Sequence, residues 1–158
     1  MIKSIKLERN CSIMFSEEKA VEIFKGGFNC SQAVLAAFSS KYGMDEKAAK
    51  KIACGFGAGC ARQSLTCGAV TGAYMVIGLK HGRTDKDDNA ARDTTYENAQ
   101  ELTEKFKSLH GSVNCTDLLE CNLGTPEGSS TFMEKELYKK KCLYYIRDVC
   151  RILEGMGF

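Results

Sequence analysis

The sequence contains no tryptophan and only one proline in 158 residues, and its charges are nearly balanced. Because proline interrupts helices, a chain with so few prolines can form long, continuous helices. The 22 basic and 20 acidic residues leave a net charge of +2, which gives no electrostatic case for binding nucleic acid. No window approaches the ~18 apolar residues of a transmembrane helix, so membrane insertion is not expected.

Several motifs of thiol and cofactor chemistry are also missing. No CxxC occurs, which excludes a thioredoxin-like motif and a zinc-ribbon knuckle. The glycine-rich stretch 54–60 lacks the lysine and Ser/Thr of a phosphate-binding loop, and no strand precedes it as in a dinucleotide fingerprint. Residues 1–14 have neither the apolar segment nor the cleavage site of a secretory signal, so a cytoplasmic location is expected.

Cysteine is what the chain has in excess. Nine in 158 residues is a high count for packing alone, and an odd number rules out a framework in which every cysteine is paired. Thiols are reactive and bind metals, so their number points to redox or metal chemistry in a reducing compartment. The cysteines are Cys11, Cys30, Cys54, Cys60, Cys67, Cys115, Cys121, Cys142 and Cys150.

The hydrophobic pattern predicts an all-α protein. Apolar residues recur at helical spacing, and no segment shows sustained two-residue alternation. We expect a single domain over residues 1–158, a bundle of about six helices, with residues 1–14 as a candidate loose N-terminal arm. The segment 64–80 is apolar nearly all round, which predicts the central helix of the bundle. Helices are expected over 16–25, 30–42, 46–56, 64–80, 87–110, 116–121 and 131–154.

Cys67 is the strongest candidate for a reactive thiol. It falls in the predicted first turn of the central helix, where free N–H groups and the helix dipole lower a thiol pKa. Arg62 is near in sequence and would add positive charge. Gly68 and Gly72 are four residues apart on one helix face, where they would allow a helix, ligand or sulfur to approach the backbone. The alternative is that both glycines serve only tight helix packing.

Residues Cys67-Gly68-Ala69-Val70-Thr71-Gly72 resemble the CGAxxG motif of the C_GCAxxG_C_C family of redox-active proteins. The likeness extends to Asn29-Cys30-Ser31-Gln32, to the segment around Cys115 and to Cys142 in the last predicted helix. It implies that Cys30, Cys67, Cys115 and Cys142 form the site and converge in space. Cys11, Cys54, Cys60, Cys121 and Cys150 lie outside the family pattern.

Two kinds of function would use such convergent thiols. The first is dithiol–disulfide chemistry or electron transfer, in which Cys67 is the nucleophile and Cys30, Cys115 or Cys142 resolves the mixed disulfide. The second is a Zn²⁺ or iron–sulfur site in which the same four thiolates are ligands. A third interpretation is a structural protein whose cysteines are incidental. The redox partner or small-molecule substrate is not specified, and association into a homo-oligomer stays open.

Cys60 offers a local alternative. The glycines at 55, 57 and 59 would let the chain fold back, so that Cys60 could pair with Cys67. The competing expectation is that Cys54 and Cys60 are only small residues where the chain is crowded.

Overall fold

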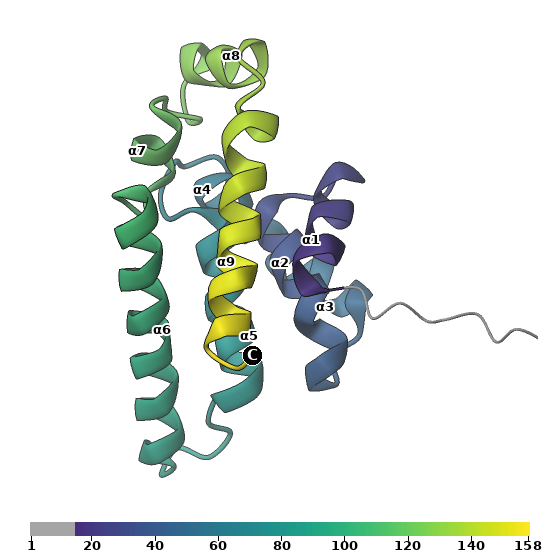
Figure 1. Ribbon diagram of the computed structural model, residues 1–158, viewed down its shortest axis with the longest axis vertical. Coiled ribbons are helices and arrows are strands. Elements are labelled where there is room, and N and C mark those ends of the chain that lie inside the picture. The colour runs from purple at the N-terminus through teal and green to yellow at the C-terminus, as the bar shows by residue number, and fades with distance from the viewer. Residues whose placement is uncertain (1–14) are drawn as a thin grey trace, which may run out of the picture.

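Three helices from the first third of the chain form one side of the molecule (Figure 1). The computed structural model describes residues 15–158, and within them α1 (Ser16–Lys25) and α3 (Glu46–Ala53) both pack against α2 (Cys30–Ser39). A capping box starts α2: the Asn29 side chain accepts from the Gln32 N–H, and the Gln32 side chain accepts from the Asn29 N–H. Short 3₁₀ turns follow α2 and α3, at Ser40–Tyr42 and Cys54–Phe56.

Three longer helices make up the rest of the bundle. α5 (Gly68–His81) contacts α2, α6 (Asn89–His110) and α9 (Leu143–Gly155), and α6 and α9 also contact each other. The prediction of an all-α fold is confirmed, since residues 15–158 contain no named strand. None of the helices in this range combines the length and apolar character needed to cross a bilayer. Among the largest fully buried side chains are Phe38, Phe106, Leu35, Ile77 and Ile146.

Shorter elements gather at one end of the bundle. In Figure 1, α4 (Gly57–Ala61), α7 (Cys115–Leu119) and α8 (Pro126–Glu134) lie toward the same end of the long axis. A π-helical turn, η3 (Tyr138–Cys142), connects this end to α9. These segments come from distant parts of the sequence, and together they enclose the candidate site.

The helix predicted over 16–25 is confirmed as α1, although its N-cap residue is Phe15, without a side-chain cap. Other predicted helix boundaries are wrong. α5 begins at Gly68 and not near residue 64, because the preceding residues pair with the segment before α7. The last predicted helix is broken into α8, η3 and α9 after Lys135, where Glu136 has a left-handed φ of 49°. The N-terminal arm expected over residues 1–14 lies outside the described residues.

α4 is a turn of left-handed rather than right-handed helix. Ala58, Gly59 and Cys60 have φ of 54°, 66° and 59°, and Ala61 and Arg62 continue at 57° and 65°. The Arg62 N–H donates to the Ala58 carbonyl oxygen at 3.1 Å, which closes the turn. Each residue with a side chain costs about 1–2 kcal/mol in this conformation. Four of the five residues therefore hold strain beside the candidate site.

Substitutions in this turn should have opposite effects on stability. Ala61→Gly removes a side chain from a left-handed position and is expected to stabilise the fold by about 1 kcal/mol. Gly59→Ala is expected to destabilise it by about 2 kcal/mol or more, because the new Cβ would lie 2.8 Å from the Cys115 Cβ and from the Leu65 nitrogen. Urea denaturation of the two variants measures both changes. A loss of stability in Ala61→Gly would contradict the proposed strain.

Candidate functional site

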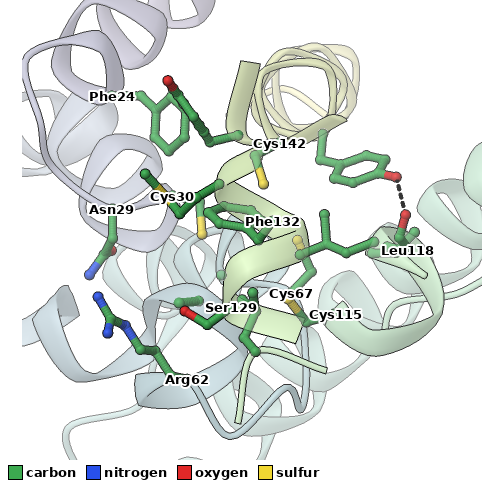
Figure 2. A pocket seen from close by; sticks show the side chains of 17 residues that line it. Phe24, Asn29, Cys30, Arg62, Cys67, Cys115, Leu118, Ser129, Phe132 and Cys142 are labelled. Atoms are coloured by element: carbon green, nitrogen blue, oxygen red, sulfur yellow. Dashed lines mark hydrogen bonds between the residues drawn. The ribbon is translucent and has the colours of Figure 1, made fainter. Parts of the chain in front are cut away.

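A cavity of about 270 Å³ lies where the short elements meet, and cysteine sulfurs line it. Figure 2 shows the side chains of Cys30, Cys67, Cys115 and Cys142 around this space. The first three are 8%, 6% and 5% exposed, and Cys142 is half-buried. The structure therefore brings together the four cysteines that the sequence singled out, from segments up to 112 positions apart.

A short backbone pairing holds Cys67 and Cys115 in place. Thr66 and Asn114 form an isolated antiparallel bridge, flanked by hydrogen bonds from Cys67 N–H to the Val113 oxygen (2.8 Å) and from Cys115 N–H to the Leu65 oxygen (2.6 Å). In such a pairing Cys67 and Cys115 are diagonal neighbours on one face. Each then leads into a helix, so Cys67 is the N-cap residue of α5 and Cys115 opens α7.

Cys30 occupies a cradle of backbone atoms. It is the first residue of α2, and its sulfur lies against Gly68 so closely that a Cβ at position 68 would overlap it. The same added Cβ would lie 2.9 Å from the Gly57 Cα. At position 57 a Cβ would overlap the Asn29 side chain, which donates to the Cys54 oxygen at 2.9 Å. Side chains at these two glycines would displace the sulfur or its cap.

Cys142 lines the cavity from a much later segment of the chain. It ends η3, just before α9 begins at Leu143. Nearby, the Tyr145 hydroxyl donates to the Leu118 oxygen at 2.8 Å, which ties α9 to α7, as the dashed line in Figure 2 marks. The remaining wall is mostly apolar, and its larger hydrocarbon and thioether side chains are Phe24, Leu118, Leu119, Leu123, Phe132 and Met133.

The two glycines of the motif are in different surroundings. Gly68 lines the cavity, beside the Cys30 sulfur. Gly72 lies one turn further along α5, where an added Cβ would be 2.9 Å from the Ser31 oxygen and 2.9 Å from the Val34 Cβ. Gly72 therefore permits close packing of α5 on α2, and it does not line the cavity.

The expected depression of the Cys67 pKa is wrong. Burial raises the pKa of this thiol well above its ordinary value, and charge on Cys30 or Cys115 would raise it further, while the N–H groups of Ala69 and Val70 only partly oppose this. Arg62 does not offset the burial. Its guanidinium is turned toward Asn29 in Figure 2, away from the Cys67 sulfur.

The other cavity thiols are also held in the neutral form. For each of them, burial is the largest cause of the raised pKa. Burial raises the pKa of Cys30, although hydrogen bonds from the N–H groups of Ala58, Ser31 and Gly68 oppose it. Burial also raises the pKa of Cys142. The pKa of Cys115 is raised to about 12, by burial and then by charge on Cys30, Cys121 and Cys60. Ionising one thiol therefore hinders ionisation of its neighbours.

The four sulfurs have the donor chemistry of a Zn²⁺ or iron–sulfur site, but their arrangement does not fit one as it stands. Within residues 15–158, no three or more His, Cys, Asp or Glu side chains are grouped closely enough to hold a metal ion. All eight cysteines in this range are free.

Comparison with protein families identifies the family of this chain. The family model described as "Putative redox-active protein (C_GCAxxG_C_C)" matches residues 28–156, which contain all four cavity cysteines. The chain belongs to the C_GCAxxG_C_C family. No curated protein and no solved structure matches the chain.

In this C_GCAxxG_C_C protein, four cysteines outside the family pattern lie within residues 15–158, and none of these four lines the cavity. Cys54 is exposed, Cys150 is buried in α9, and Cys60 and Cys121 are half-buried near Cys115. Cys11 lies outside the described residues. Cys60 does not line the cavity with Cys67, so the local Cys60–Cys67 pair has no support in this arrangement.

Sequence reasoning missed the apolar wall of the cavity. Phe24, Leu118 and Phe132 belong to separate elements, and each reads as an ordinary core residue within its own segment. The capping motif at Asn29 was visible, yet its contact with Gly57 joins segments that no local pattern connects.

Proposed function

We propose that this protein is a cytoplasmic thiol redox protein that cycles between a buried dithiol and a disulfide. One observation carries the proposal: four cysteines from distant segments line a single cavity. The description of the family as redox-active supports it. A reducing cytoplasm would return the disulfide to thiols after each cycle.

Cys67 and Cys30 are the proposed working pair. The Cys30 sulfur lies against Gly68, the residue next to Cys67. The Cys67 thiolate would attack an incoming disulfide, and Cys30 would then attack the Cys67 sulfur and release the second thiol. Cys115 and Cys142 stand beside this pair and are the alternative resolving thiols.

The raised pKa values should make the thiols of this site slow to react near neutral pH. Since burial keeps the thiols neutral near pH 7, few thiolates are present and reaction with general oxidants should be slow. The exchange rate should rise with pH, because each increase in pH enlarges the small thiolate fraction.

The proposal is tested by counting thiols and metal on protein purified without oxygen. Glutathione disulfide is expected to oxidise two thiols reversibly and to link Cys67 to Cys30, Cys115 or Cys142, as mapped by mass spectrometry. Cys67→Ala should abolish this linkage, while Cys150→Ala, a buried cysteine away from the cavity, should retain it. Iron or zinc near one per chain, without a reversible change in thiols, would instead support the metal-binding alternative.

A further inference from the structure

The charge at the cavity indicates which substrate it could admit. Among residues 15–158, Arg62 is the only charged residue that lines it, and no acidic residue of this range does. Arg62 is exposed, and within residues 15–158 no carboxylate pairs with its guanidinium. The Arg62 guanidinium therefore places a positive charge at the edge of a mostly apolar, thiol-lined space.

The backbone adds to this positive character. Cys30 opens α2 and Cys67 caps α5, so the N-terminal ends of two helices face the cavity. Arg62 itself ends the left-handed turn, with φ of 65°. That strained conformation sets where its side chain leaves the backbone, beside Asn29 in Figure 2.

The walls of the cavity favour a ligand that is largely apolar. Phe24, Phe132 and Tyr138 supply aromatic surface, and Leu119 and Leu123 supply aliphatic surface. A cavity of about 270 Å³ is large enough for one small aromatic molecule and far too small for a folded protein.

We propose that the cavity takes a small aromatic disulfide that carries an anionic group, with its apolar body between the walls and its anion at Arg62. This inference rests on the proposed function and names the substrate class of the same site. The Cys67 thiolate attacks one sulfur, which forms a mixed disulfide and releases one aryl thiolate. The Cys30 thiolate then displaces the second aryl thiolate from Cys67. The protein loses two electrons and two protons as Cys30 and Cys67 become a disulfide, and the substrate is reduced to two thiolates.

Two probe disulfides distinguish the effect of the substrate's charge on the reaction from the effect of its shape. The dianionic probe is 5,5′-dithiobis(2-nitrobenzoate), and the uncharged probe is 2,2′-dithiodipyridine. Mass spectrometry after acid quenching follows the appearance of a disulfide between two cavity cysteines, so that reaction at exposed thiols such as Cys54 does not contribute. The variants are Arg62→Gln, Arg62→Lys and, as an exposed control away from the cavity, Arg83→Gln.

Arg62→Gln is expected to slow cavity oxidation by the dianionic probe at least fivefold and to leave the uncharged probe unchanged. Arg62→Lys should recover most of the rate, and Arg83→Gln should match the parent. Equal rates for parent and Arg62→Gln with the dianionic probe would overturn the anion assignment, as would an equal slowing with both probes. If neither probe links cavity cysteines in the parent, the proposed redox function itself is wrong.

Discussion

Raising the pH from 8 to 10 is expected to remove much of the stability of the reduced protein. Besides the half-buried Cys121, burial raises the pKa of five thiols above the ordinary value of about 9, namely Cys30, Cys67, Cys115, Cys142 and Cys150. In the unfolded chain these thiols ionise near pH 9, while in the folded chain they stay protonated. Stability is therefore fully present below pH 9 and falls as the pH rises through the unfolded value.

The size of this loss follows from one pKa unit being worth about 1.4 kcal/mol. At pH 10 each buried thiol costs the folded state up to about 1.4 kcal/mol, so the five together can cost about 7 kcal/mol. This is comparable with the total stability of a typical domain, about 5–15 kcal/mol. Urea denaturation followed by circular dichroism between pH 7 and 10.5, with reductant present, measures the change.

A matched variant isolates the contribution of a single thiol. Cys150→Ala removes a buried cysteine outside the cavity, so the loss between pH 8 and 10 should shrink by about one fifth. Stability that stayed constant over this range would mean that the sulfurs are solvated when charged.

Gly72→Val is expected to destabilise the protein by about 3 kcal/mol through overpacking. The Cβ atom of the new side chain alone would lie 2.9 Å from the Ser31 oxygen and 3.3 Å from the Ser31 Cα. Because these are backbone atoms of α2, α5 would have to move away. Thermal or urea denaturation measures the loss, and the thiol reactivity of the cavity should change with it.

Gly78 provides the control within the same helix. A Cβ at this position has no heavy atom within 4 Å, so Gly78→Ala should stabilise α5 by about 1 kcal/mol through helix propensity alone. Similar effects of the two substitutions would show that the face of Gly72 is not closely packed.

The sequence predicted some elements well because their signals are local. The helix start at residue 30 and the helix end at residue 110 were predicted correctly, where Asn29 caps α2 and Gly111 ends α6 with a left-handed φ of 80°. Both depend on residues within a few positions of the helix end. The start of α5 was misplaced because the pairing of Thr66 with Asn114 joins segments 48 positions apart.

Helical periodicity and the order of four cysteines were enough to predict the all-α class and the family. The chemistry around those cysteines instead depends on how distant segments pack. A helix N-terminus predicts an acidic thiol at Cys67, yet burial by α2, α7 and the turn at Gly57 outweighs the helix dipole and raises the pKa. The cavity walls and the place of Arg62 at its edge also arise only when distant segments pack together, since desolvation depends on neighbours in space and not on neighbours in sequence.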